Sequence, residues 1–164
     1  MVKINYTDYS IEVKSTSDGE TLNSLYDIHT ENGISKIAYS YEVLNPIEEK
    51  DGAFVFPEEY KTVKSGSVTV RNGKIVERDG AEIDVDVAKI TGIGLKFDST
   101  YFENESVKDD YYTAEVKNVK AFFGRNIDCT EMTIAIDYSD SRFEKVAISY
   151  VNAKSSVEIV YLFD

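Results

Sequence analysis

The side chains that most often carry out acid–base, thiolate or zinc chemistry are nearly absent from this chain. Its 164 residues include one histidine, His29, and one cysteine, Cys129, against 30 carboxylates and 12 tyrosines. A cysteine nucleophile needs a neighbouring base, and the only histidine lies about a hundred residues away in the sequence. One histidine and one cysteine also fall short of a zinc ligand set. We therefore expect a small buried Cys129, a polar His29 near a turn, no catalytic residue, no metal and no cofactor.

The carboxylates are the remaining candidates for chemistry. Calcium prefers such oxygen ligands, but no acidic group matches a known loop: counted from Asp137, position twelve is Ile148, where an EF-hand needs glutamate. A carboxylate pair could also hydrolyse glycosides, although thirty acids make some pair inevitable. Solvated surface charge is the preferred interpretation. The acidic groups considered are Asp84 with Asp86, Asp137 with Asp140, and Asp109-Asp110 with Glu103 and Glu105.

The overall charge restricts the partners. A formal net charge of −12 argues against direct binding to nucleic acid, because such binding depends on Lys and Arg neutralising phosphates. The clusters Glu48-Glu49, Glu58-Glu59 and Asp109-Asp110 are able to mimic a phosphate backbone and occupy a nucleic-acid-binding protein, although solubilising charge is the commoner role. No apolar run approaches the roughly 20 residues of a membrane span.

The beginning of the sequence leaves two locations open. Residues 1–6 alternate like a strand and lack the apolar stretch of a secretory signal. Either the protein is cytoplasmic, or Met1 replaces a removed leader and the protein is secreted or held at the cell surface. A lone cysteine excludes an internal disulfide but does not identify the compartment.

Alternation of apolar and polar residues is the dominant local pattern and predicts half-buried antiparallel strands. The clearest run spans residues 37–43, in which Ile37, Tyr39, Tyr41 and Val43 share one face. Turn signals separate such runs, and Asn72-Gly73 predicts a hairpin between residues 67 and 77. A second hairpin is predicted between residues 133–138 and 145–150. Further alternating runs are residues 68–70, 83–87, 134–138, 146–150 and 157–161.

Helix is predicted at only three short segments. Residues 57–64 start with Pro57 and two acids and end before Gly66, which suits one or two helical turns. The other two candidates are residues 86–91, before Gly92, and residues 118–123, before Gly124. We therefore predict an all-β or β-dominated α+β fold, a hairpin meander that forms a barrel, half-barrel or sandwich.

The chain length fits a single domain, residues 1–164, which contains an internal echo. Residues 9–14 resemble residues 112–117, and residues 34–41 resemble residues 143–150 in the same order. Common strand patterning alone produces such echoes, so chance and duplication both stay open. A duplication would relate residues 9–45 to residues 112–152 around an insert, residues 46–111.

An aromatic-rich segment supplies the candidate binding residues. Tyr101, Phe102, Tyr111 and Tyr112 flank an acidic loop, and tyrosine offers a large rigid contact area with a polar tip. The alternative is that alternate members face the core while their neighbours reach solvent. We predict these four residues as a surface for a ligand or partner.

Three functions follow from these observations, in order of preference. The first is a non-enzymatic binding or structural module that contacts protein, glycan or a small apolar ligand. Its tyrosine-rich, cysteine-poor, acidic β composition resembles that of bacterial cell-surface and lipoprotein domains. The second is a cytoplasmic acidic inhibitor, such as a phage-type antagonist, that blocks a basic nucleic-acid-handling protein. The third is a carboxylate-dependent hydrolase. The oligomeric state is not predicted.

Overall fold

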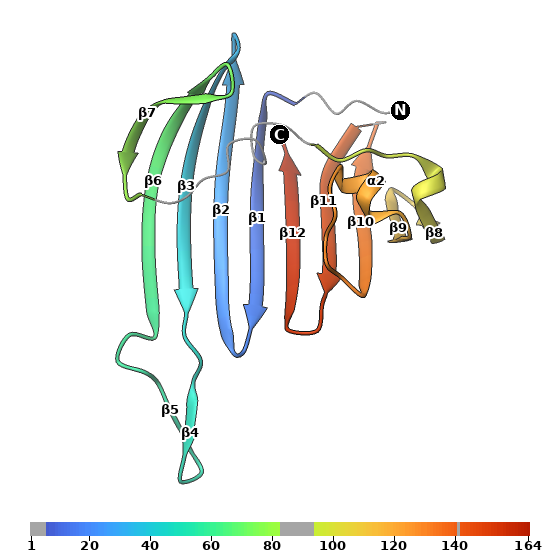
Figure 1. Ribbon diagram of the computed structural model, residues 1–164. Helices are drawn as coiled ribbons and strands as arrows, with labels where there is room; N and C mark the ends of the chain where they lie inside the picture. Colours follow the sequence, from blue (N-terminus) through green and yellow to red (C-terminus); the bar gives the residue numbers. More distant parts are fainter. Residues whose placement is uncertain (1–5, 83–93, 141) are drawn as a thin grey trace.

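The alternating segments form one large antiparallel sheet (Figure 1). The structure is a computed structural model that describes residues 6–82, 94–140 and 142–164. Ten strands pair in the order β7-β6-β3-β2-β1-β12-β11-β10-β9-β8, and β4 with β5 forms a separate two-stranded sheet. The strands are β1 (Asp8–Ser17), β2 (Glu20–Glu31), β3 (Ile34–Leu44), β4 (Glu48–Lys50), β5 (Ala53–Val55), β6 (Lys61–Arg71), β7 (Lys74–Gly80), β8 (Phe102–Lys108), β9 (Tyr111–Val116), β10 (Glu131–Ser139), β11 (Arg142–Val151) and β12 (Ser155–Phe163).

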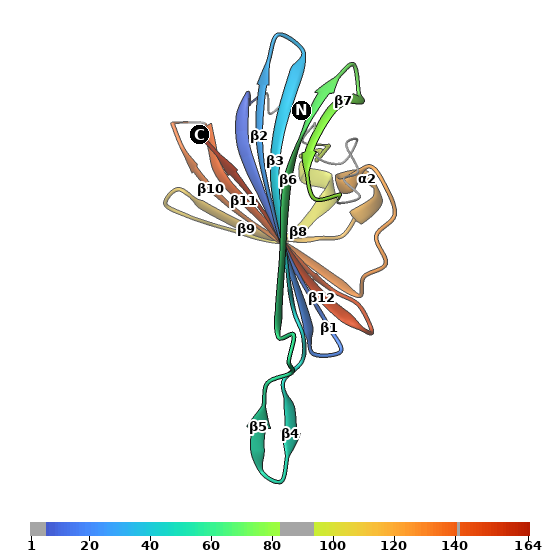
Figure 2. The same cartoon turned by 90° about the vertical axis from the view of Figure 1, so that its left-hand side faces the viewer.

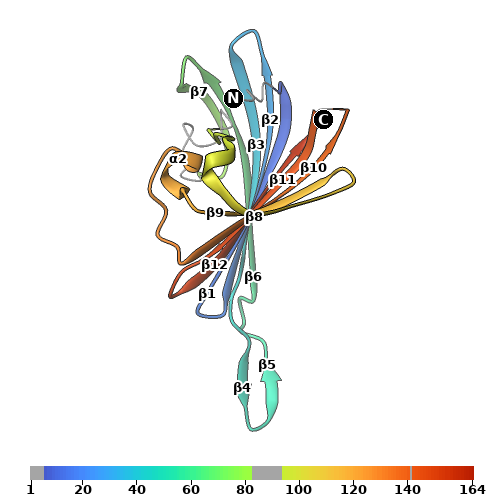
Figure 3. The same ribbon diagram turned by 90° about the vertical axis from the view of Figure 1, so that its right-hand side faces the viewer.

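The predicted all-β class and antiparallel meander are confirmed, but the sheet does not close into a barrel. Its first and last strands pair with each other at the centre, where Tyr9 lies opposite Phe163. The N-terminal wing therefore comprises β1, β2, β3, β6 and β7, and the C-terminal wing comprises β8 to β12 (Figure 1). The strands fan out strongly when viewed along the sheet (Figures 2 and 3), as the right-handed twist of strands produces over many neighbours.

The two faces of the sheet differ in chemistry. On the core face, Tyr9 and Ile11 of β1 lie beside Ile28 and Tyr26 of β2. The polar face carries the alternate residues, such as Ser10, Glu12 and Lys14. The buried hydrophobic residues are Tyr9, Ile11, Ile28, Ile37, Tyr39, Val68, Val70, Leu95, Phe102, Ala114, Val116, Phe122, Met132, Ile134, Ile136, Val146, Ile148, Tyr161 and Phe163.

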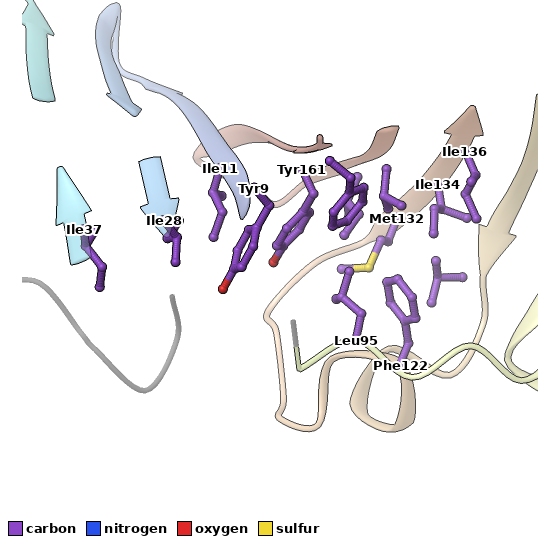
Figure 4. Close-up of a cluster of buried hydrophobic side chains, with 14 of the residues drawn as sticks. Tyr9, Ile11, Ile28, Ile37, Leu95, Phe122, Met132, Ile134, Ile136 and Tyr161 are labelled. Atoms are coloured by element: carbon purple, nitrogen blue, oxygen red, sulfur yellow. The ribbon is translucent and has the colours of Figure 1, made fainter. Parts of the chain in front are cut away.

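Two short helical segments accompany the C-terminal wing, on the core side of the sheet (Figures 2 and 3). They are η1 (Ser99–Tyr101) and α2 (Val119–Phe123). Phe122 of α2 is fully buried, and Leu95 packs in the same cluster. Figure 4 shows Leu95 and Phe122 beside Met132 and Ile134 of β10. Aromatic and aliphatic side chains from outside the sheet therefore complete the core of this wing.

Several local predictions are confirmed. The Asn72-Gly73 turn joins β6 to β7 with positive φ at both residues, as a tight hairpin turn requires. The second predicted hairpin is the pair β10 and β11. The helix before Gly124 is also present: the Asn118 side chain accepts a hydrogen bond from the Ala121 amide at 3.1 Å, and Gly124 ends the helix at φ +73°.

The predicted helix over residues 57–64 is wrong. A turn occupies Glu58 and Glu59, and strand β6 begins at Lys61. Lys61 and Thr62 pair with the end of β3, so cross-strand pairing and β-branched side chains prevail over the weak helix signal. The predicted strand over residues 83–87 and the predicted helix over residues 86–91 lie outside the described residues.

The internal echo falls on corresponding strands. Residues 9–14 lie in β1, and residues 112–117 lie in β9 except for the last one, which follows the strand. Residues 34–41 lie in β3, and residues 143–150 lie in β11. These are the first and third strands of two three-stranded meanders, β1-β2-β3 and β9-β10-β11. Residues 46–111 supply β6, β7 and β8 to the same sheet. The duplication stays a prediction.

Candidate functional site

The four predicted binding residues do not gather on one surface. Phe102, the first residue of β8, is only 5% exposed. Tyr101 and Tyr112 are half-buried and pack against the core, whereas Tyr111 is 45% exposed. Because Tyr111 and Tyr112 are consecutive in a strand, their side chains point to opposite faces of the sheet.

Phe102 belongs to an aromatic cluster inside the C-terminal wing. Its ring lies 5.5 Å from that of Phe122, 6.3 Å from that of Tyr112 and 6.4 Å from that of Phe97, measured between centroids. The Tyr112 hydroxyl donates a hydrogen bond to Glu105 at 3.0 Å, and burial together with this carboxylate raises the pKa of Tyr112 to about 12. These rings pack against one another as a core does, so the ring of Phe102 is not available to a partner.

Cys129 and His29 lie apart and have different surroundings. Cys129 is half-buried and packs against the core, where burial and the neighbouring Asp128 charge raise the pKa of its thiol. A raised pKa disfavours the reactive thiolate. His29 lies near the end of β2 and pairs through Nδ1 with the Asp8 carboxylate, a hydrogen bond that lowers the pKa of Asp8.

Shallow depressions lie on the polar face of the sheet among the described residues. One has a volume of about 530 Å³ and is lined by residues that include Asp8, His29 and Lys36. Two others measure about 360 and 330 Å³, and both include Lys14 and Glu158. Each lining mixes charged and hydroxyl-bearing residues with a few apolar ones, unlike the mostly apolar pockets that hold small ligands.

Acidic residues do not converge on a metal site in the described part of the chain. Within residues 6–82, 94–140 and 142–164, no three side chains of His, Cys, Asp or Glu are close enough to hold an ion together. The pair Asp84 and Asp86 lies outside these residues. None of the helices that the structure describes is long and apolar enough to cross a membrane.

The most unusual surface is a projecting arm, residues 46–60, built around the β4–β5 hairpin. It extends well beyond the end of the ten-stranded sheet (Figures 1 to 3). Phe54 is 77% exposed and Phe56 is 60% exposed, and Ile47 and Val55 are exposed to a smaller extent, 43% and 40%. Large apolar side chains are usually buried, so this concentration at one projecting tip needs an explanation.

The base of the arm is fixed to the sheet. The Asn45 amide donates to the Tyr60 carbonyl at 2.9 Å, and Asn45 Nδ2 donates to the Glu59 carbonyl at 2.6 Å. The Phe56 and Tyr60 rings pack edge to face with centroids 5.0 Å apart. Gly19 in the β1–β2 turn lies close to Pro46. A Cβ added at Gly19 would be 3.0 Å from the Pro46 Cβ. The arm therefore projects from a defined base.

Acidic residues surround the apolar side chains of the arm. Glu49 pairs with Phe54 across the hairpin, and Glu48 pairs with Val55. Glu58 and Glu59 follow Phe56 after one residue, Pro57. The lysine of the arm, Lys50, contacts Glu48 with Nζ 3.1 Å from Oε2.

Sequence reasoning missed the arm although its signals were present. Asp51-Gly52 is a turn signal of the Asp-Gly type, and the pairs Glu48-Glu49 and Glu58-Glu59 are among the acidic clusters that the sequence shows. The three-residue strands are too short for an alternating pattern to stand out. The combination of an Asp-Gly turn with Phe54-Val55-Phe56 was the signal that would have found it.

Comparisons with known proteins add no relatives. A scan against models of protein families finds no match to this chain. A search of curated protein sequences likewise finds no match.

Proposed function

We propose that this protein is a non-enzymatic protein-binding module and that the arm is the part that contacts the partner. The observation that supports this is the exposure of Phe54 and Phe56 on a hairpin that projects from the sheet. Buried aromatic anchors supply much of the energy at protein interfaces, and each buries about 150–250 Å². Exposed on a projection, such rings are suited to fill pockets on another protein.

The sheet does not need the arm for its own pairing. Strands β3 and β6 pair from Ile34 with Arg71 to Leu44 with Lys61, and the arm begins only beyond this last pair. An isolated two-stranded hairpin is marginally stable in water, so a partner that covers the apolar side chains would stabilise the arm. This separation between scaffold and projection is typical of recognition loops.

A protein fits the arm better than a glycan or a small apolar ligand. Small ligands bind in concave sites that surround most of their surface. Here the exposed phenylalanines lie on a convex projection, whereas the depressions lie on the polar face. The location at a bacterial cell surface stays a prediction from composition.

Site-specific photo-crosslinking in the source cells tests this proposal. The crosslinker p-benzoylphenylalanine at position 54 should give one discrete protein adduct. The matched control carries it at position 107, because Val107 is an equally exposed apolar residue on the edge strand β8. The adduct should disappear when Phe56→Ser is added. No adduct at position 54, or the same adducts from position 107, would overturn the proposal.

A further inference from the structure

We infer that the partner of the arm presents an apolar pocket bordered by basic side chains. This inference rests on the proposed function, since it describes what the arm would contact. It follows from the arrangement of charge around Phe54 and Phe56. The partner is thereby defined as a protein surface rich in Arg and Lys around a pocket for an aromatic ring.

The arm carries a disproportionate share of the negative charge. Its 15 residues contain five carboxylates and one lysine, a net charge of −4 out of −12 for the whole chain. The lysine is already paired with Glu48. Among the described residues, no Lys or Arg forms an ion pair with Glu49, Asp51, Glu58 or Glu59. These charges are therefore free to attract cations of a partner.

Acidic residues stand next to the phenylalanines of the arm, both across the hairpin and at its base. Glu49 lies opposite Phe54 in the hairpin, and Glu58 and Glu59 follow the phenylalanines at the base. A partner that accepts the Phe54 ring would place its own rim against these carboxylates. Arginine suits such a rim, because its guanidinium pairs with carboxylates through two hydrogen bonds and stacks on aromatic faces. Complementary charge at a rim mainly speeds association and selects the partner.

The same charges disfavour the other occupants of an exposed apolar hairpin. Anionic lipid surfaces and nucleic acids repel a carboxylate-rich tip. A second copy of this chain would bring two tips with a net charge of −4 together, unless it offered a basic surface elsewhere. Repulsion of this kind acts over about 8 Å at physiological salt, so it acts on surfaces that come into contact. A basic protein surface is attracted instead.

A random twelve-residue peptide library displayed on phage provides the probe. The full chain is the bait, and clones are counter-selected against an arm-trimmed variant in which residues 46–59 are replaced by Asn-Gly. Asn45 and Tyr60 are already hydrogen-bonded, so a two-residue turn closes this hairpin. We expect the selected peptides to combine Arg or Lys with an aromatic or leucine residue. Their synthetic versions should bind at least about ten-fold more weakly in 0.5 M NaCl.

Two charge variants separate the inference from the proposed function. The arm variant carries Glu48→Gln, Glu49→Gln, Glu58→Gln and Glu59→Gln and keeps both phenylalanines. The control removes the same charge from the polar face through Glu12→Gln, Glu115→Gln, Glu131→Gln and Glu158→Gln, all at exposed positions. The arm variant should lose peptide binding at least about ten-fold, and the control should lose less than about two-fold. Circular dichroism and thermal melting confirm that each variant is folded.

The outcomes are distinguishable. Peptides that need the arm but show no basic bias, and that bind the arm variant normally, would overturn the basic rim and leave the proposed function intact. Failure to recover any peptide that survives the counter-selection, together with retained binding of the unsubtracted clones to the arm-trimmed variant, would overturn both. Co-sedimentation with vesicles of phosphatidylcholine and phosphatidylglycerol (3:1), lost in the arm-trimmed variant, would identify a membrane surface as the occupant and overturn the inference.

Discussion

The C-terminal wing and the arm use the same residue types in opposite ways. Phe122 is fully buried among other rings, whereas Phe54 is 77% exposed. Phe122 lies 5.6 Å from Phe97 and 5.5 Å from Phe102 between ring centroids. In the arm, the Phe56 ring packs edge to face with Tyr60 and is still 60% exposed. In the C-terminal wing, α2 and the segment before η1 cover the sheet, so the rings there stabilise the fold. The rings of the arm remain exposed.

The largest expected effect is at the centre of the buried cluster. Phe122→Ala should lower the free energy of unfolding by about 3–5 kcal/mol, because it removes apolar burial and leaves a cavity. Urea denaturation followed by circular dichroism measures this change. A loss below about 1 kcal/mol would show that the cluster is not tightly packed and would weaken the contrast with the arm.

The second effect is a fall in the free energy of unfolding at high pH, caused by a buried tyrosine of the sheet. Burial raises the pKa of Tyr9 to about 12, with a contribution from Tyr161, while an unfolded tyrosine ionises near 10. Between pH 10 and 12 the unfolded chain releases a proton that the folded chain retains, so the free energy of unfolding falls as pH rises. The fall from this residue is at most about 1.4 kcal/mol per pH unit.

Denaturation curves at pH 9, 10, 11 and 12 measure this slope. Tyr9→Phe should make the slope shallower, since the variant has no hydroxyl to ionise at this position. The arm-trimmed variant should keep the slope of the wild type, because Tyr9 lies in β1. An unchanged slope in Tyr9→Phe would contradict the assignment.

Two asparagines provide a smaller, matched comparison. Asn118→Ala removes the cap of α2, which holds Phe122, and should cost about 1 kcal/mol of global stability. Asn45→Ala removes a side-chain hydrogen bond at the base of the arm. We expect it to speed amide hydrogen exchange in the arm without changing global unfolding. Equal effects of both changes on urea denaturation would contradict this difference.

The smallest expected effect on stability is at the tip of the arm. Phe54→Ser should change the free energy of unfolding by less than about 0.5 kcal/mol, because its ring has little contact to lose. The same urea denaturation that reports Phe122→Ala measures it. A loss comparable to that of Phe122→Ala would show that Phe54 is part of the core and would remove the basis for the proposed function.

Local chemistry predicted much of the fold. The alternation at residues 37–43 identified the core face of β3, where Ile37 and Tyr39 are buried. Asn72-Gly73 identified a turn because few residues tolerate positive φ. Asn118 and Gly124 mark the two ends of α2, because an asparagine side chain caps the first turn and a glycine adopts the positive φ that ends a helix. These signals depend on the backbone of a few neighbouring residues, so distant contacts do not alter them.

The candidate site was harder to predict, because exposure depends on what lies above each face. Phe102 and Phe54 both stand in aromatic-rich, acidic segments of the sequence. Phe102 is buried because Phe97, Tyr112 and Phe122 of α2 pack around its ring. The helix expected over residues 57–64 failed for a related reason, because its pairing partner in β3 is distant in the sequence.

The sequence by itself determined an acidic, antiparallel β protein with short turns at Asn-Gly and Asp-Gly, since periodicity, turn chemistry and charge are properties of neighbouring residues. The tertiary structure decided that the first and last strands pair, that the sheet stays open and that Phe54 projects while Phe102 is buried. These outcomes depend on contacts between residues far apart in the chain, which maximise apolar burial for the molecule as a whole.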